Sequence, residues 1–340
     1  MRTGRLLALL IVALGLAPGV WLQTYVPPEA DRPPIHVERL ASPQPEVGRL
    51  RATGLWEISS AHPFFGGFSA MVYVERETGT DALLIGSDRG YMMELPVIGG
   101  RPHREGAALV DYWRKPVSGE PLIDLESMTR DPASGTLWTG YENTNTVLRE
   151  RRRNQEQSVF ARRAPPEMAG WRYNSGPETM ERLADGRFLV IAEGRSDDAD
   201  SDQRRQEALL FERDPVEPQN PLRFTFASPK GYAPVDATGL PDGRVLILLR
   251  RVRWGVPIQF SGAIMVADPT DIAPGEIWTG RIIARLDGPV LGENFEGIAF
   301  VAQASTNGPA GSIYVVADDN LSAFQRTLFL RLAWPAGGKR

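Results

Sequence analysis

Four acidic residues occupy matching places in a pattern that recurs along this 340-residue chain. They are Glu126 in LIDLESMTRDP, Glu178 in NSGPETMERLADG, Asp236 in PVDATGLPDG and Glu296 in NFEGIAF, and Ser69 in FGGFSAMVYVE takes the corresponding place in an earlier copy. Each is followed by a small residue and an apolar residue, and then by a turn and an apolar strand. The pattern predicts that each acid lies at the start of a buried strand.

A second series of polar residues stands where the apolar strand of each copy abruptly becomes charged. Its members are Asp88, Glu142, Glu193, Arg250 and Asp318, which lie 14 to 22 residues beyond the first series. If the copies surround a common axis, equivalent positions form rings, and the two series face a shared space.

Carboxylates crowded into a narrow space repel one another, so some must take up protons, pair with arginine or share a cation. Calcium suits such a place because it takes about 6 to 8 oxygen ligands and tolerates irregular geometry. The chain has no cysteine, and its three histidines show no ligand spacing, which disfavours zinc and copper. The alternative is that the acids only bind backbone amides and tie the repeats together.

The repeat also predicts the fold. From Ser69 to Glu296 the copies recur at spacings of 57, 52, 58 and 60 residues. Their strands are apolar on both faces, as in RFLVIAEG, and little helical periodicity lies between them. Sheets packed on sheets around an axis bury both faces, so we predict an all-β fold: a β-propeller of five or six blades with a central acidic channel. Residues 36–65 add outer strands or complete a sixth blade by pairing with the C-terminal TLFLRLAW.

The N-terminus predicts export. Two arginines precede an apolar segment and then a proline-rich stretch, which is the order of a secretory signal. We expect residues 1–22 to be a signal peptide or an uncleaved membrane anchor, 23–34 a linker, and 35–340 the propeller domain, in the periplasm or secreted. No cysteine follows the apolar run, which excludes a lipoprotein. The net charge of −4 disfavours a nucleic-acid partner.

The ordered set of motifs resembles a known family. GFSAM with GSDRG, DLESMTRDPASGTLWTGYEN, NSGPETMERLADGRFLVIAEG, and NFEGIAF with VVADDN and TLFLRL are similar to the bacterial phytase-like family, described by an esterase-like activity of phytase. The resemblance runs from about residue 54 to 332, and GPETM departs from the usual family pattern around the acid. It implies an exported β-propeller that hydrolyses phosphate or carboxylate esters.

The resemblance also implies roles for the two series. Calcium held by Glu126, Glu178, Asp236 and Glu296 would assist hydrolysis of a small anionic ester. An acid of the second series, Asp88, Glu142, Glu193 or Asp318, would act as the catalytic base. Arg89 and Arg250 would bind the anionic group of the substrate.

Two other functions fit the same residues. One is a six-bladed lactonase-like enzyme that uses one calcium in the channel. The other is a propeller without catalysis that binds a ligand or an envelope protein at its channel mouth. Nucleophilic catalysis is disfavoured because no G-x-S-x-G elbow is present: Ser69 in GFSAM lacks the final glycine.

Overall fold

A computed structural model describes the chain over residues 33–41, 46–76, 80–112, 122, 124–152, 158–171, 176–194, 202–255, 258–303, 310–320 and 325–334. The predicted signal or anchor (1–22) and nearly all of the linker (23–34) lie outside these ranges, so both stay predictions. Within the ranges, no helix has the length and apolar character needed to cross a membrane.

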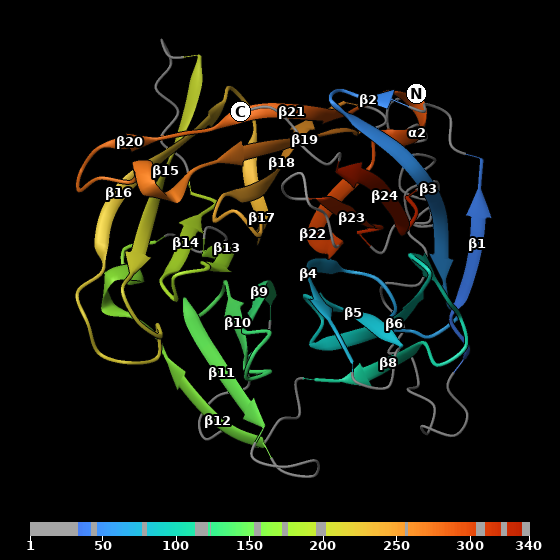
Figure 1. Cartoon of the computed structure of the whole chain (residues 1–340), viewed down its shortest axis with the longest axis horizontal. Coiled ribbons are helices and arrows are strands. Elements are labelled where there is room, and N and C mark those ends of the chain that lie inside the picture. The colour runs from blue at the N-terminus through green and yellow to red at the C-terminus, as the bar shows by residue number, and fades with distance from the viewer. Residues whose placement is uncertain are drawn as a thin grey trace, which may run out of the picture.

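The described strands form five sheets around a centre, in which every pairing is antiparallel except that of β20 (Figure 1). The strands of each blade are given from the innermost outward. Blade one contains β4 (Phe68–Val74), β5 (Asp81–Ser87), β6 (Tyr91–Ile98), β7 (Arg101–Pro102) and β8 (Ala108–Asp111). Blade two contains β9 (Leu125–Arg130), β10 (Leu137–Tyr141), β11 (Thr146–Arg152) and β12 (Ser158–Arg163). Blade three contains β13 (Pro177–Arg182), β14 (Phe188–Ala192), β15 (Gln203–Phe211), β16 (Leu222–Pro229) and the parallel β20 (Ile277–Trp278).

Blade four contains β17 (Ala233–Gly239), β18 (Val245–Arg253), β19 (Gln259–Ala267) and β21 (Arg281–Leu286). Blade five contains β22 (Asn294–Gln303), β23 (Ala310–Asp318), β24 (Leu328–Trp334), β3 (Leu50–Ser59), β1 (His36–Leu40) and β2 (Glu46–Val47). The described helices are short: η2 (Pro166–Met168), η3 (Pro269–Asp271) and α2 (Gly288–Leu291).

The fifth blade joins the two ends of the described chain. β3 pairs antiparallel with β24, so that Leu55 lies opposite Leu330, and β1 pairs with the outer side of β3. The predicted pairing between the N-terminal segment and TLFLRLAW is therefore confirmed. The strands within residues 36–65 are outer strands of this blade, and the propeller has five blades.

The apolar faces of the strands are buried between neighbouring blades. In β14, Leu189 and Ile191 pack toward blade four, whereas Phe188 and Val190 belong to a cluster with Trp138 of blade two. Side chains alternate along a strand, so each middle strand contributes to two layers of the core. This packing is the reason for the unbroken apolar runs in the sequence.

Every inner strand carries an irregularity in its pairing near its first residues. The register shifts within or opposite Phe68–Ala70, Leu125–Ser127, Pro177–Thr179, Pro234–Asp236 and Phe295–Gly297. The residues inside these β-bulges are Ser69, Glu126, Glu178, Val235 and Glu296. A bulge re-aims a side chain. The prediction that Asp236 is equivalent to the other acids was wrong by one residue, because the bulge in blade four contains Val235.

Side chains of neighbouring blades satisfy polar groups of the inner strands. The Ser69 hydroxyl donates to the Leu125 carbonyl, and the Ser127 hydroxyl donates to the Pro177 carbonyl at 2.5 Å. Glu181 accepts a bond of 2.7 Å from the Gly239 amide. These bonds connect blades one to two, two to three and three to four.

Asp236 accepts hydrogen bonds from three different blades at the centre of the propeller, here called the hub. Its carboxylate is fully buried and accepts hydrogen bonds from the amides of Ile298 at 2.8 Å, Ala237 at 2.9 Å and Met71 at 3.3 Å. These amides belong to blades five, four and one. Asp318 adds a bond of 3.2 Å from the Phe68 amide, which links blade five to blade one.

We expect Asp236→Ala to lower the free energy of unfolding by about 3 kcal/mol, because it leaves buried amides without an acceptor. Asp236→Asn keeps one acceptor oxygen and should lose less. Urea unfolding measures both, and Asp287→Ala, an exposed aspartate without a side-chain cap bond, is the control. Equal stability of Asp236→Ala and the control would contradict a structural role for this carboxylate.

Candidate functional site

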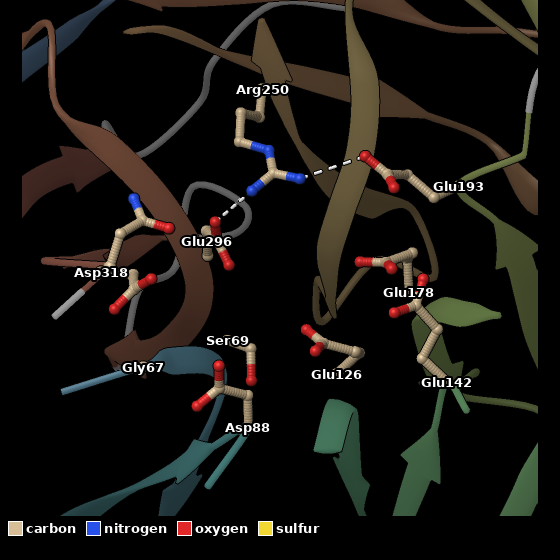
Figure 2. A pocket seen from close by; sticks show the side chains of 11 residues that line it. Gly67, Ser69, Asp88, Glu126, Glu142, Glu178, Glu193, Arg250, Glu296 and Asp318 are labelled. Atoms are coloured by element: carbon tan, nitrogen blue, oxygen red, sulfur yellow. Dashed lines mark hydrogen bonds and ion pairs between the residues drawn. The ribbon is translucent and has the colours of Figure 1, made fainter. Parts of the chain in front are cut away.

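An acidic cavity of about 200 Å³ lies at the beginning of the inner strands (Figure 2). Seven carboxylates and one guanidinium line it, together with small or neutral residues. Its lining residues are Gly67, Ser69, Asp88, Glu126, Glu142, Glu178, Glu193, Arg250, Glu296, Asp318 and Asn320. Both predicted series therefore contribute to one cavity. A channel along the axis stays a prediction.

Two structural devices bring the carboxylates together. The bulges supply Glu126, Glu178 and Glu296 from the inner strands, and the acids of the second series follow or end the neighbouring strands. Gly67 allows Asp88 to approach, since it has a φ of 65° and a Cβ there would lie 2.0 Å from an oxygen of Asp88. A side chain at residue 67 would be strained by this backbone conformation and would displace the Asp88 carboxylate.

The densest group of carboxylates lies across blades two and three. Asp124, Glu126 and Glu142 can each bring one oxygen within 4.8 Å of the others, and so can Glu142, Glu178 and Glu193. Burial, followed by repulsion from neighbouring carboxylates, raises the pKa of Glu126 and of Glu178 well above the ordinary value. Burial also raises the pKa of Glu142. The cavity therefore favours either protons or a cation at these oxygens.

Asp124 was missed in the sequence, and so was Asn320. Asp124 stands two residues before Glu126, outside the repeated pattern, and has a positive φ of 69°. Its carbonyl accepts a bond of 3.0 Å from the Glu142 amide, which brings the two acids close. The only available signal was the acidic pair Asp124 and Glu126 at alternate positions.

Arg250, on β18 of blade four, lines another wall of the cavity. Its guanidinium donates to Glu193 at 3.1 Å and makes a close ion pair with Glu296, as the dashed lines in Figure 2 show. Glu296 also accepts a bond of 2.6 Å from the Asn294 side chain. The neighbouring acids raise the pKa of Arg250, although burial opposes this effect. Arg250 thus neutralises part of the acidic wall by pairing with Glu193 and Glu296.

Asp88 and Asp318 form the remaining wall, away from Glu142 and Glu178 (Figure 2). Burial raises the pKa of Asp88 to about 6, with Arg89 opposing the shift and Asp124 and Glu296 adding to it. Burial and the charge of Glu296 raise the pKa of Asp318 well above its ordinary value.

Two predicted site residues do not line the cavity. Asp236 is buried in the hub, where backbone amides occupy both of its oxygens. Its predicted role as a metal ligand is therefore corrected to a structural one. Arg89 donates to the Pro63 carbonyl at 3.1 Å, and its guanidinium lies 5.7 Å from the centre of the Phe64 ring. It lies beside Asp88 in sequence and affects the cavity through its charge.

The donor set is suited to a hard cation. Its atoms are carboxylate oxygens, burial raises the pKa of Glu126 and Glu178, and no cysteine exists in the chain to favour a soft metal. Apart from Arg250, no cationic side chain lines the cavity among the residues that the structure describes. The residues present therefore fit an ion such as calcium.

The fold and cavity define a class: five-bladed β-propellers with a carboxylate-lined pocket at the hub. The family model for phytase-like proteins, described as "esterase-like activity of phytase", matches residues 63–321. The chain belongs to this family, which confirms the resemblance of its motifs. A search among curated proteins finds no match.

Several solved structures are similar at low sequence identity. A hypothetical protein from Leishmania major is 13% identical, with 80% of this chain and 87% of that chain covered and a TM-score of 0.41. An α-L-arabinanase from Penicillium chrysogenum, complexed with arabinobiose, is 10% identical, with 82% and 84% covered and a TM-score of 0.41. The β-propeller domain of Cps50 (Swd1) from Myceliophteria thermophila is 10% identical, with 86% and 99% covered and a TM-score of 0.38. Similarity at this level says nothing about function.

We expect Arg250→Met to lower the free energy of unfolding by about 3 kcal/mol at neutral pH, because it leaves the buried Glu296 and the half-buried Glu193 without their counter-charge. Adding Glu296→Gln to the variant should restore part of the loss, since one uncompensated charge is removed. Urea unfolding of the single and double variants measures this coupling. Arg281→Met, on an exposed arginine, is the control. Strictly additive losses would contradict the ion pair.

Proposed function

We propose that this protein is an exported hydrolase that cleaves a phosphate or carboxylate ester with the help of a divalent cation, most simply calcium. The observation that carries the proposal is the cavity itself, in which buried carboxylates share a small volume with one oriented guanidinium. Membership of the phytase-like family supports an ester as the substrate. The fold alone would not, because propellers serve many functions.

The cation would be held by Glu126, Glu142 and Glu178, with Asp124 and Glu193 beside them. Glu296 contributes less than the sequence suggests, because Arg250 and Asn294 already bind it. When bound, a divalent cation polarises an ester oxygen and lowers the pKa of a water molecule. The raised pKa values of Glu126 and Glu178 support this assignment, since a cation stabilises the ionised forms of both acids.

The chain's own residues have complementary tasks. Arg250 is fixed at two nitrogen atoms by Glu193 and Glu296, so its orientation is set before a ligand arrives. Its remaining N–H groups orient the anionic part of the substrate. Asp88, on another wall, accepts the proton of the attacking water. The bond broken is the ester bond, and the products are an acid and an alcohol.

Ester and phosphate release, measured with and without a chelator, tests the proposal. We expect hydrolysis that a chelator abolishes and calcium restores. Glu178→Gln should lower the rate at least about 100-fold, because it removes one charge from the cation-binding group. Glu276→Gln removes the same charge from an exposed position and should leave the rate unchanged.

Each other outcome has a defined meaning. Hydrolysis that survives chelation would reject the role of the cation. Turnover of lactones alone would assign the lactonase-like function. No turnover from a broad panel, with ligand binding retained in Glu296→Gln, would reject the hydrolase and favour a binding propeller.

The pH dependence tests the base. Asp88 acts in its ionised form, and its pKa is raised to about 6, so activity should fall roughly tenfold per pH unit below that value. Asp88→Asn should lower the rate by about 100-fold or more and abolish this acidic limb. Asp287→Asn, on the surface, should keep the limb. An unchanged profile in Asp88→Asn would assign the proton transfer to another group, with Asp318 the next candidate.

Export stays part of the proposal. The order of arginines, apolar segment and proline-rich stretch at residues 1–34 supports a periplasmic or secreted protein, either released or tethered to the membrane. Fractionation of cells that express the full chain, followed by N-terminal sequencing, separates a cleaved signal from an anchor.

A further inference from the structure

A second cavity, of about 320 Å³, lies at the other end of the inner strands from the acidic cavity. The bulge residues of four blades line the acidic cavity, whereas the residue four positions after the bulge lines the second cavity in all five blades. These residues are Tyr73, Arg130, Arg182, Gly239 and Phe300. At about 3.3 Å per residue, they lie about 13 Å along the strands from the bulges. The second cavity is therefore separate from the acidic one and large enough for a small ligand.

Two sides of the second cavity differ in chemistry. Tyr73 and Phe300, on the neighbouring blades one and five, supply aromatic rings, here named the aromatic wall. Guanidinium groups come from blades two, three and four and are here named the arginine wall: Arg130, Arg182 and Arg244. An aromatic wall together with an arginine wall suits a molecule that has an apolar body and a group of acceptor oxygens.

Acidic side chains of two turns orient the arginine wall. Asp131 lies 3.7 Å from a guanidinium nitrogen of Arg182. Asp242 accepts bonds of 2.9 Å and 2.6 Å from the Nε and a terminal nitrogen of Arg244. A guanidinium has five N–H groups, so an ion pair with one carboxylate leaves further donors for a ligand.

Glu181 is the only acid among the described residues that line this cavity. Its carboxylate accepts a bond of 2.9 Å from the Thr129 hydroxyl and one of 2.7 Å from the Gly239 amide. Burial raises the pKa of Glu181 to about 7, although these two bonds and the charge of Arg182 oppose the shift. Glu181 can therefore gain or lose its proton near neutral pH.

Few other charged groups face Glu181. The strands that pack against β13 are β9, β10, β14 and β17, and of these β10 and β14 carry no charged residue. β9 ends with Arg130 of the arginine wall, and β17 carries Asp236. Burial raises the pKa of Asp236 well above its ordinary value, and the charge of Glu181 adds to this effect.

The charges at the cavity balance only when Glu181 is ionised. The arginine wall carries three positive charges, and the ion-pair partners Asp131 and Asp242 carry two negative charges. Ionised Glu181 supplies the third negative charge. A proton on Glu181 therefore leaves one positive charge in excess, which a single anionic group of a ligand would cancel.

We propose that the second cavity binds an organic monocarboxylate, with its carboxylate on the arginine wall and its apolar body against the aromatic wall. A guanidinium matches the planar shape of a carboxylate and can donate two parallel bonds to it. Binding takes up a proton at Glu181, because the added negative charge favours the neutral form of this acid. This inference goes beyond the proposed hydrolysis, since the binding needs neither a cation nor turnover.

Calorimetric titration of the full chain with 2-naphthoate tests the arginine wall. A chelator in the buffer keeps a cation in the acidic cavity from binding the carboxylate. We expect 2-naphthoate to bind at least about tenfold more tightly than 2-naphthamide, which has the same shape and no charge. Arg182→Gln and Arg244→Gln should each weaken the binding of 2-naphthoate about tenfold or more.

A matched control comes from the same blade. Arg187 follows Arg182 by five residues, pairs with Asp185 at 2.8 Å and is not among the described residues that line the cavity. Arg187→Gln removes the same charge nearby and should bind 2-naphthoate as the parent does.

The pH dependence gives a readout that a loss of folding cannot imitate. The affinity of the parent should fall about tenfold from pH 6 to pH 8, because the pKa of Glu181 is about 7 and its ionised form repels the ligand. The probe stays ionised over this range, since a carboxylic acid titrates near about pH 4. Glu181→Gln should bind 2-naphthoate at pH 8 as tightly as the parent does at pH 6.

Equal binding by Arg182→Gln and Arg187→Gln would overturn the proposal, and so would equal affinity for 2-naphthamide. A pH dependence that persists in Glu181→Gln, or no binding of 2-naphthoate at millimolar concentration, would overturn it as well. The titration measures binding alone, so a failure of the proposed hydrolysis leaves its result unaffected.

Discussion

The free edges of the inner strands are the constraint on which the rest of this propeller depends. Each blade ends at the centre with backbone groups that no further strand can pair, and a buried unpaired group is costly. The chain satisfies many of them with side chains of neighbouring blades: hydroxyls of Ser69 and Ser127 on carbonyls, and carboxylates of Asp236 and Asp318 on amides. The acids at the hub therefore divide into two kinds. Some complete the backbone hydrogen bonding, and others remain available to a ligand.

Blade four departs from the other blades in a way that shapes the cavity. Its bulge contains Val235, whereas the bulges of three other blades contain glutamate. At the end of its second strand it has Arg250, whereas the other four blades have an acid there. An unbroken ring of acids would have to bind more protons or more cations. The single guanidinium makes the cavity asymmetric, with the densest carboxylates on one side and a positive group on the other. Such polarity suits a ligand that has both an electrophilic and an anionic part.

The sequence predicts the architecture well and the individual side chains less well. Neighbouring residues of one strand, such as Leu189 and Val190, are both apolar, so both faces of the strand must pack against other blades. The repeated pattern predicts the five inner strands. The position of Asp236 depends on which residue bulges. Each copy places the acid within one residue of the bulge, so composition cannot distinguish a side chain directed into the cavity from one directed into the hub. Asp124 lies outside the repeat, and only backbone geometry brings it to Glu142.

The fifth blade has a consequence for the order of assembly. β3 and β24 pair residues such as Glu57 and Leu328, which are 271 positions apart in the chain. Ordering so long an intervening segment carries a large entropic cost unless the blades between are already formed. We therefore expect the fifth blade to be completed after the other four blades have formed. Because Glu296 and Asp318 on this blade line the cavity together with Asp88 on the first blade, closing the ring of blades also completes the cavity.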